Sequence, residues 1–210
     1  MNAANPSDHL AGPVLPAALA ALLPEGMAAA CEAGRYERNA LVFARGNRPA
    51  WMYYVVSGEV VLVRETPSGE GVILQRTRGG FVSEASLRTA QYHCDARATA
   101  ETVVIKVPVA ALVHALERDP AFALRWIDML NAEVRHLRSH CERLAMKSVK
   151  ERLVHLIRSE GRGGHYAAPS GLKTLAAELG VSHEALYRTV ATLEAEGRLV
   201  REAGALLLRD

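Results

Sequence analysis

The side chains best suited to recognise another molecule lie directly after Ser182. His183, Glu184, Tyr187 and Arg188 recur about one helical turn apart, so they share one side of the first two turns of a predicted helix. An Arg there can donate two hydrogen bonds to guanine and a Glu can accept one from cytosine, and each pair contributes ~1 to 3 kcal/mol of base discrimination. The same spacing also fits a simpler interpretation, a surface ion pair between Glu184 and Arg188.

A helix-turn-helix pattern positions these side chains. One helix is expected from a Ser170 cap to Leu179; Gly180 ends it, and Ser182 caps the next. Ser182 and Lys173, which lies on the first helix, are then placed for phosphates. Apolar residues on both helices are expected to lock them at a steep angle: Leu175, Ala176, Leu179, Val181, Leu186, Val190 and Leu193.

The flanking segments complete a small α+β unit. Ser148 is expected to cap a helix that ends near Ser159, followed by a glycine-rich loop and a short strand at 165–167. Residues 198–201 and 205–208 then predict a β-hairpin. Helix, turn, helix and hairpin are the outline of a winged helix-turn-helix. Such a unit can also serve protein contacts alone, and this alternative stays open.

A heptad pattern precedes this unit. Helix-forming residues dominate from Pro108 to Arg158, and apolar positions alternate at spacings of three and four. The seam consists of Ile127, Leu130, Val134, Leu137, Cys141 and Leu144, with Ser148 at the next position. Its expected charged flanks are Asp128, Glu133, Arg135, Arg138, Glu142 and Arg143. So narrow a stripe favours a homodimeric coiled coil over packing of one helix on its own domain.

The region before Pro108 has a different pattern. Short β-type runs closed by turn residues occupy 41–43, 52–56, 60–64, 72–75 and 103–107. They predict an antiparallel sandwich or roll, preceded by a short packing helix at 16–23. The expected fold class is therefore α+β. Its domains are a β-roll sensor domain at 1–118, a dimerisation helix and hinge at 119–147, and a winged helix-turn-helix at 148–210.

Composition narrows the class of protein. Of the 210 residues 50% are hydrophobic, and 25 Lys and Arg against 23 Asp and Glu leave a net charge of +2. The surplus lies after Leu144, but it is too small to indicate a nucleic-acid partner by itself. Three scattered cysteines suit a reducing compartment. Without a signal peptide or a membrane-spanning apolar run, the sequence predicts a cytoplasmic protein that does not associate with membranes.

The order of these parts and several motifs resemble the Crp/Fnr family of bacterial transcription regulators, over residues 20–210. The resemblance lies in residues 55–60 (VVSGEV) and 81–87 (FVSEASL) of the roll, and in residues 175–182 (LAAELGVS) with Glu184, Arg188 and Gly197. It implies a β-roll, a long dimer helix and a DNA-reading winged helix, with base reading by Glu184 and Arg188. It also implies a homodimer on double-stranded DNA that contacts RNA polymerase.

Two positions of the recognition helix depart from the family pattern. His183 stands where the cyclic-AMP-binding members have a base-reading Arg, and Tyr187 where the family usually has a small Gly or Ser. We therefore expect a two-fold-symmetric DNA site that keeps the bases read by Glu184 and Arg188 but differs at the outer position.

The resemblance weakens in the predicted effector pocket, which comprises Ser83, Glu84, Ala85, Tyr92, His93, Leu137 and Arg138. Cyclic-AMP-binding members hold the phosphate with an Arg and a Gly-Glu turn, because a buried phosphate needs a charged fork and N–H donors. Here Ser83 replaces the Gly, and Tyr92 and His93 stand where the Arg and its neighbour would be. These departures argue against cyclic AMP, unless a gapped alignment brings Arg88 or Arg97 into the pocket.

Other sensor groups need other ligands. An iron-sulfur cluster needs four thiolates, and the family's N-terminal Cys group is missing. His93 or Cys94 could be an axial haem ligand, although a surface His beside a buried Cys is the simpler interpretation. Cys141 could form a disulfide across the dimer or pack as a small apolar residue. His136 and His140 lie one turn apart, without an evident third metal ligand.

The sequence contains no catalytic constellation, phosphate loop or metal motif, so no catalytic or metal-binding residue is predicted and an enzyme is the least favoured class. The predicted function is a cytoplasmic, homodimeric, sequence-specific transcription regulator with effector or redox control through the roll. Two alternatives stay open. One is a small-molecule-binding module whose winged helix docks a protein, and the other is a DNA-binding regulator without an effector.

Overall fold

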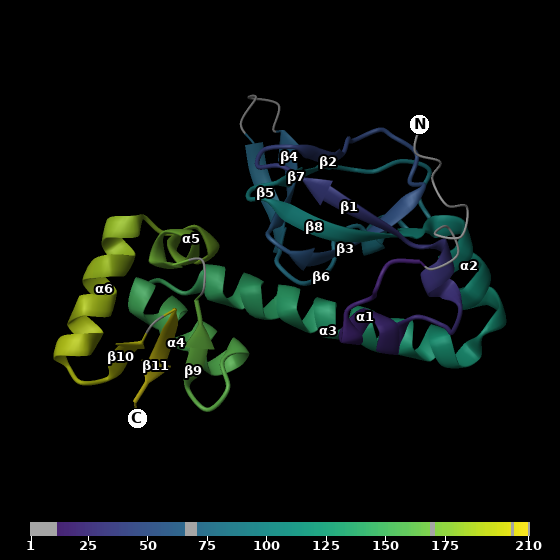
Figure 1. Ribbon diagram of the computed structural model, residues 1–210. Helices are drawn as coiled ribbons and strands as arrows, with labels where there is room; N and C mark the ends of the chain where they lie inside the picture. The colour runs from purple at the N-terminus through teal and green to yellow at the C-terminus, as the bar shows by residue number, and fades with distance from the viewer. Residues whose placement is uncertain (1–11, 66–70, 169–170, 203, 210) are drawn as a thin grey trace, which may run out of the picture. The chain divides into compact units, whose positions relative to one another are not determined.

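The computed structural model describes residues 12–65, 71–168, 171–202 and 204–209 (Figure 1). It divides into two compact units, Met1–Asp128 and Met129–Asp210. The helices, two of them short 3-10 segments (η), are α1 (Ala17–Leu22), η1 (Met27–Ala30), η2 (Glu84–Ser86), α2 (Val109–Arg118), α3 (Pro120–Ala145), α4 (Val149–Glu160), α5 (Gly171–Glu178) and α6 (His183–Ala195). The boundary between the units falls inside α3, and each unit is described by itself below.

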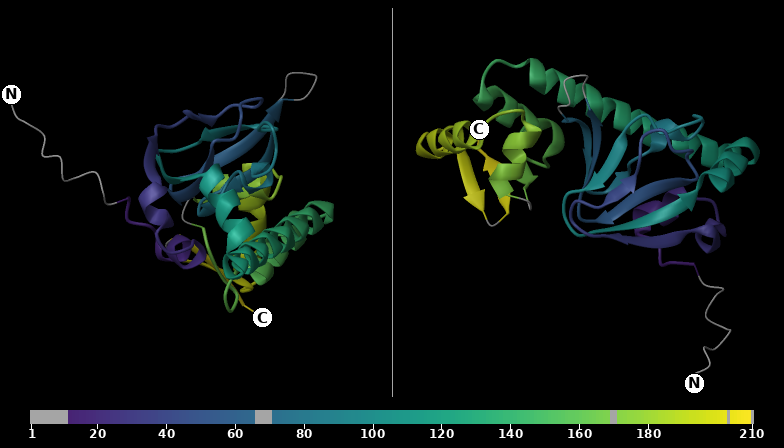
Figure 2. Two further views of the ribbon diagram at one scale, coloured as in Figure 1. Left: turned by 90° about the vertical axis from the view of Figure 1, so that its right-hand side faces the viewer. Right: turned by 90° about the horizontal axis from the view of Figure 1, so that it is seen from above.

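Two four-stranded antiparallel sheets form the roll of the first unit. Their orders are β1-β8-β3-β6 and β2-β7-β4-β5, which confirms the predicted antiparallel roll (Figures 1 and 2). The strands of the roll are β1 (Glu32–Tyr36), β2 (Leu41–Phe43), β3 (Trp51–Ser57), β4 (Val60–Glu65), β5 (Gly71–Thr77), β6 (Gly80–Phe81), β7 (Asp95–Ala98) and β8 (Thr102–Pro108). All five predicted runs are strands, whereas β1, β6 and β7 lie outside them.

Side chains from both sheets meet in one apolar core. It contains Val42, Phe43, Tyr53, Val55, Val60, Leu62, Val82, Tyr92, Cys94, Ala96, Ala98 and Val104, all buried. Tyr92 stacks on Phe43 with ring centroids 3.9 Å apart, and its hydroxyl donates a hydrogen bond to the Trp51 carbonyl at 2.7 Å. The phenol therefore buries its ring without leaving its polar atom unpaired.

The turn between β3 and β4 requires a glycine. Gly58 has a φ of +84°, and a Cβ atom added there would lie 2.3 Å from the Glu101 carbonyl oxygen. Glycine therefore lets the backbone turn from β3 into β4 while it passes close to Glu101. This turn is the centre of the VVSGEV motif.

Glu59 is a buried acid that is held by basic and hydroxyl groups. It is 8% exposed; its Oε1 lies 2.8 Å from Arg76 Nη1 and accepts a hydrogen bond from Thr99, and its Oε2 lies 2.8 Å from Arg78 Nε. Burial disfavours the charged carboxylate, but the hydrogen bond from Thr99 and the charges of Arg78 and Arg76 outweigh burial and lower the pKa of Glu59.

Helix α3 begins as part of the roll unit. Asp119 separates it from α2, accepts a hydrogen bond from the Phe122 N–H at 3.0 Å, and precedes Pro120, a residue suited to the first helical position. Phe122 and Trp126 are buried, and the Trp126 ring lies 5.2 Å from that of Phe81. The predicted helical region thus consists of separate helices.

The second unit contains α4, α5, α6 and a small antiparallel sheet of order β10-β11-β9. These strands are β9 (His165–Ala167), β10 (Leu199–Glu202) and β11 (Ala205–Leu208), as the sequence predicts.

Ser148 caps α4 in a capping box with Glu151, which also confirms the prediction. Ser148 therefore lies outside α3, and the heptad pattern within that helix ends at Leu144. The Ser170 cap lies outside the described residues.

Within the described residues, no helix combines the length and apolar character that crossing a membrane would need.

Replacing Glu59 by Gln tests the buried ionic cluster. The free energy of unfolding at pH 7 should fall by about 2 kcal/mol, because two partly buried guanidinium groups lose their countercharge. A carboxyl whose pKa is lower in the folded state stabilises the fold above its ordinary pKa of 4.5 and loses that contribution as the pH falls through the folded value. The difference from wild type should therefore shrink below about pH 4.5.

Urea unfolding followed by tryptophan fluorescence measures this effect, since Trp51 and Trp126 both lie in the first unit. Glu101→Gln, which neutralises an exposed acid, is the control. Equal losses of stability at pH 7 for the two variants would contradict the assigned role of Glu59.

Candidate nucleic-acid interface

The turn between α5 and α6 is tight and built around a glycine. Gly180 has a φ of +65°, and the Val181 N–H donates to the Ala176 carbonyl at 3.0 Å. A Cβ atom at Gly180 would lie 3.2 Å from Leu144 Cδ2, so the position combines a left-handed backbone with a close approach. Helix α6 begins three residues later.

The inner face of α6 is buried against α4, α5 and the sheet. The core contains Leu153, Leu156, Ile157, Leu175, Ala176, Leu179, Leu186, Val190, Leu193, Leu199 and Leu206, with Val181 and others partly buried around it. The apolar positions predicted to lock α5 and α6 together therefore occupy this core. Burial of one face determines which residues α6 presents on the other.

The first turn of α6 is capped and carries a negative charge. The Ser182 hydroxyl accepts a hydrogen bond from the Ala185 N–H at 3.2 Å. Hydrogen bonds from the backbone N–H of Glu184 and from Ser182 lower the pKa of the Glu184 carboxyl, and the charge of Arg188 acts in the same direction. Glu184 is thus ionised at neutral pH and can only accept hydrogen bonds.

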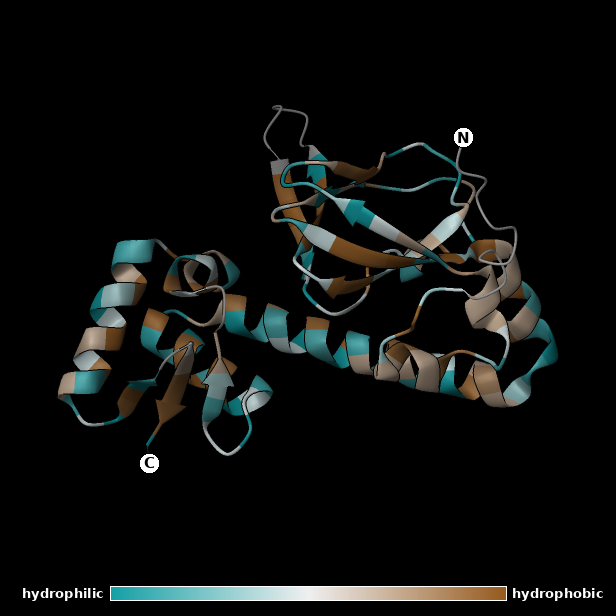
Figure 3. Ribbon diagram, viewed as in Figure 1, coloured by the Kyte–Doolittle hydropathy of each residue, from teal (hydrophilic) through white to brown (hydrophobic). Residues whose placement is uncertain are grey.

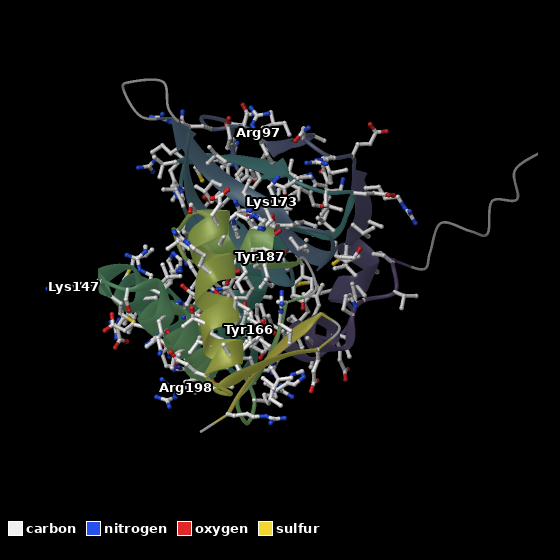
Figure 4. The ribbon with its side chains drawn as sticks, turned by 90° about the vertical axis from the view of Figure 1, so that its left-hand side faces the viewer. Arg97, Lys147, Tyr166, Lys173, Tyr187 and Arg198 are labelled. Atoms are coloured by element: carbon white, nitrogen blue, oxygen red, sulfur yellow. The ribbon has the colours of Figure 1, made fainter. Side chains whose placement is uncertain are left out.

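The outer face of α6 presents an aromatic pair beside charged groups. The rings of His183 and Tyr187 meet edge to face with centroids 4.3 Å apart, and 44% of Tyr187 is exposed. Arg188 and Glu184 are exposed. Figure 4 views α6 from this side and labels Tyr187 and Lys173; Lys173 is exposed on α5. The predicted base-reading residues therefore belong to one solvent-facing surface.

Polar contacts join the elements around α6 to that helix and to one another. Arg201 on β10 donates to Glu194 at 2.9 Å, and Lys150 on α4 donates to Glu196 at 2.8 Å. Tyr166 on β9, also labelled in Figure 4, donates to Glu178 at the end of α5. These contacts involve exposed groups for the most part, so each contributes little to stability. Arg201 thereby links the hairpin to α6, and the other two contacts link α4 to α6 and β9 to α5.

The predicted seam is an exposed apolar stripe on α3. Figure 3 shows apolar colour recurring from turn to turn along the helix. Ile127 is 50% exposed, Val134 44%, Leu137 40% and Leu144 44%; Cys141 is also exposed, and Leu130 is partly buried. Repeated large apolar side chains in water are typical of a surface that another chain covers.

Arg143 corrects one part of the seam prediction. The heptad pattern places it on the charged, solvent-facing flank of α3, but it is 1% exposed. Its Nη2 lies 2.6 Å from Glu160 Oε1, and its Nη1 donates hydrogen bonds to the hydroxyls of Ser139 and Ser159 at 3.3 Å. The heptad pattern predicts which side of α3 faces a second copy of that helix. It gives no signal for the burial of Arg143, because the residues that cover this side chain lie on α4.

The residues of the predicted effector pocket occupy different environments. Ser83 is buried, and its hydroxyl lies 3.0 Å from the Met52 sulfur; Glu84 and Ala85 follow in η2. Tyr92 is a core residue, as described above, and His93 is exposed. The exposed residues Leu137 and Arg138 lie on the part of α3 that belongs to the second unit.

The candidate sensor ligands differ in their exposure and in their neighbours. His93 is exposed, whereas Cys94 is 1% exposed, and burial raises the pKa of its thiol, which disfavours the thiolate that a metal or haem iron needs. His136 Nδ1 lies 3.8 Å from Glu160 Oε1, and burial lowers the pKa of His140. The described part of the chain holds no group of three His, Cys, Asp or Glu side chains that could bind a metal ion.

Removing the hydroxyl of Ser182 tests how α6 is started. Ser182→Ala should destabilise the second unit by about 1 kcal/mol, because the Ala185 N–H loses its acceptor. Ser182→Thr, which keeps the oxygen, should stay close to wild type. Hydrogen exchange of the Ala185 amide measures the effect, and equal protection in the Ala and Thr variants would rule out the cap.

Comparisons with known proteins agree on the fold. Residues 34–119 match the sequence profile of the cyclic nucleotide-binding domain. The solved structure of FixK2 from Bradyrhizobium japonicum has a TM-score of 0.65 and 22% identity, covering 86% of this chain and 93% of that one. The c-di-GMP responsive global regulator CLP from Xanthomonas campestris has a TM-score of 0.58 and 21% identity, covering 87% and 95%.

A CRP-family transcriptional regulator from Thermus thermophilus has a TM-score of 0.56 and 20% identity, covering 84% of this chain and 92% of that one. No curated protein sequence matches the chain. Residues 34–119 are therefore similar to a cyclic nucleotide-binding domain, and the chain shares its fold with these solved structures over 84–87% of its length.

Proposed function

We propose that the protein is a homodimeric, sequence-specific DNA-binding transcription regulator of the Crp/Fnr type. The outer face of α6 carries the proposal, because polar and aromatic side chains project there from a helix whose opposite face is buried. A helix anchored in this way, with α5 before it and a hairpin after it, suits the major groove. The shared fold with structures described as a global regulator and as a transcriptional regulator supports this function.

Each exposed group of α6 has a distinct role in this proposal. Arg188 donates two hydrogen bonds to a guanine, and Glu184, being ionised, accepts from a cytosine. The ring pair of His183 and Tyr187 contacts the outer position of the half-site, where it replaces the family's Arg and small residue. Ser182 and Lys173 contact phosphates, which fix the register of the helix on the duplex.

The exposed seam of α3 provides the dimer. Two such stripes pack in parallel and remove from water the apolar side chains that one chain leaves exposed. A parallel pair relates the two recognition helices by a two-fold axis. The operator is then a two-fold-symmetric sequence with half-sites about one helical turn apart.

The roll acts as the sensor domain, at residues 1–118, with the helix and joint at 119–147 and the DNA reader at 148–210. Tyr92 supports an effector other than cyclic AMP, because a core tyrosine stands where the phosphate-binding Arg would be. An effector acts by binding one arrangement of the dimer more tightly than the other. RNA polymerase is the expected protein partner on the promoter.

Selection of bound DNA by the purified full chain tests the function. Wild type should enrich a two-fold-symmetric site in a salt-sensitive manner. Arg188→Ala should lose its preference at one base pair of each half-site, a loss of ~1 to 3 kcal/mol of discrimination. Arg158→Ala, which removes an exposed arginine from α4, should keep the wild-type preference.

The outcomes separate the rival functions. Binding without enrichment of any sequence would overturn the proposal and favour a module whose winged helix docks a protein. Enrichment by wild type with an unchanged preference in Arg188→Ala would remove Arg188 from base reading. If the enriched site and its affinity are the same with and without cell extract, the regulator without an effector is favoured.

A charge in the seam tests the dimer. Leu137→Asp should weaken dimerisation at least ~100-fold, or ~2.7 kcal/mol, because the carboxylate would be buried between two helices. Arg135→Gln alters an exposed residue outside the seam and should stay dimeric. Sedimentation equilibrium measures both.

Mild oxidation with diamide should link Cys141 to Cys141 of the partner subunit, since parallel in-register seams bring equal positions together. A monomeric wild type would refute the seam.

A further inference from the structure

One side chain joins the end of α3 to the turn that precedes α6. Arg152 is the fourth residue of α4, and its described hydrogen bonds go to backbone carbonyls. Its Nε donates to Met146 at 3.0 Å, and its Nη2 donates to Leu144 at 3.2 Å. Its Nη1 donates to Leu179 at 2.9 Å and to Gly180 at 3.4 Å.

The chemistry of this contact suits an arginine. Leu144 carries one of the last carbonyls of α3, and Leu179 and Gly180 directly follow α5, so their oxygens are the acceptors that helix ends leave unpaired. Both helix ends also carry partial negative charge. The guanidinium group of Arg152 has a permanent positive charge and a rigid set of five N–H donors. It can therefore bind carbonyl oxygens at the ends of both helices at the same time.

The two segments that Arg152 joins also touch directly. A Cβ atom at Gly180 would lie 3.2 Å from Leu144 Cδ2 and 3.6 Å from Arg152 Nη1. The turn backbone therefore lies against the last turn of α3. Because α6 begins at His183, fixing Gly180 fixes where the recognition helix begins.

A second contact fastens the same end of α3 at the other end of α4. The buried Arg143 reaches Glu160 and Ser159, which lie in the last turn of α4. Arg143 and Arg152 thus hold the end of α3 at both ends of α4. The link between α3 and α4 consists of only three residues, 146–148. The contacts of Arg143 and Arg152 restrict rotation of α3 relative to α4 about this link.

We infer that Arg152 is a positioning residue that sets the angle between the dimer helix and the recognition helix, and thereby the spacing of DNA half-sites that the dimer accepts. This inference rests on the proposed function. Arg152 acts through the backbone at Leu144, Leu179 and Gly180 and needs no contact with DNA. Its loss should therefore loosen the relation between the two recognition helices without changing how either one reads bases.

The test measures binding of full-length protein to synthetic duplexes that carry the selected half-sites at centre-to-centre spacings varied by one base pair, and to a duplex with a single half-site. Wild type should prefer one spacing. Arg152→Met keeps the apolar stem and removes the fork, and it should lower that preference about tenfold. Its affinity for the single half-site should stay within about twofold of wild type.

Two further variants make the result decisive. Arg158→Met removes an exposed arginine from the same helix and should keep the wild-type spacing profile. Arg152→Lys keeps the charge without the fork, so it should broaden the profile as Arg152→Met does. Arg152→Lys takes over the test if Arg152→Met fails to fold, as judged by circular dichroism.

The results distinguish this inference from the proposed function. Wild type that prefers no site would overturn the proposed function. Wild type with a sharp spacing preference that persists in the folded Arg152 variants would overturn the inference alone. A uniform loss of affinity for every duplex, including the single half-site, would also overturn it, because that pattern indicates a purely structural role.

Discussion

The presentation of α6 depends on the complete burial of its inner face. Leu186, Val190 and Leu193 are each 0% exposed, and burial of such side chains contributes ~1.5 to 3 kcal/mol apiece. A helix of this length would be marginal alone in water, so packing both forms it and fixes its rotation about its own axis. The residues on the opposite side of α6 therefore face solvent, because the apolar residues of the inner face are held in the core. The polar outer surface of α6 is thus a consequence of the burial of its apolar face.

If this surface binds DNA as proposed, its recognition has to rely on few charges. The net charge of the chain is only +2, and several basic groups near α6 are already engaged: Arg201 with Glu194, Lys150 with Glu196 and Arg152 with backbone carbonyls. A surface of this kind attracts a phosphate backbone less strongly than a basic patch would. Hydrogen-bond geometry at base edges and the fit of two half-sites then carry a larger share of the binding free energy.

Local signals predicted most of the fold. The five strand runs, the Ser148 and Ser182 caps and the C-terminal hairpin are encoded by residues near one another in sequence, so they could be read directly. Strands β1 and β7 contain small and charged residues (EAGRY and DARA) and are strands because β8, β2 and β4 pair with them. Their pairing is a tertiary effect that no local pattern carries.

The site was predictable in part for the same reason. The outer face of α6 follows from helical periodicity, and its four residues share one surface as expected. The basic residues that hold the second unit together gave no such signal. Arg143 sits on an apparent solvent flank, and Arg152 bonds to carbonyl oxygens, which every residue possesses and no sequence pattern identifies. Periodicity reports which residues are apolar, not which backbone atoms lie within reach of a guanidinium group.

Helix α3 meets three environments along its length, and this limits how a signal can travel. Its first turns are fixed in the roll unit by Phe122 and Trp126, and its last turn is fixed to the second unit by Arg143 and Arg152. Between them, Val134 and Leu137 face solvent in the single chain. If α3 pairs as proposed, each end of the helix moves together with the unit that holds it. The part of α3 that can still change its contacts is then the seam, where it packs on the same helix of the partner subunit. An effector in the roll would then alter DNA binding by favouring one packing of the two seams over another.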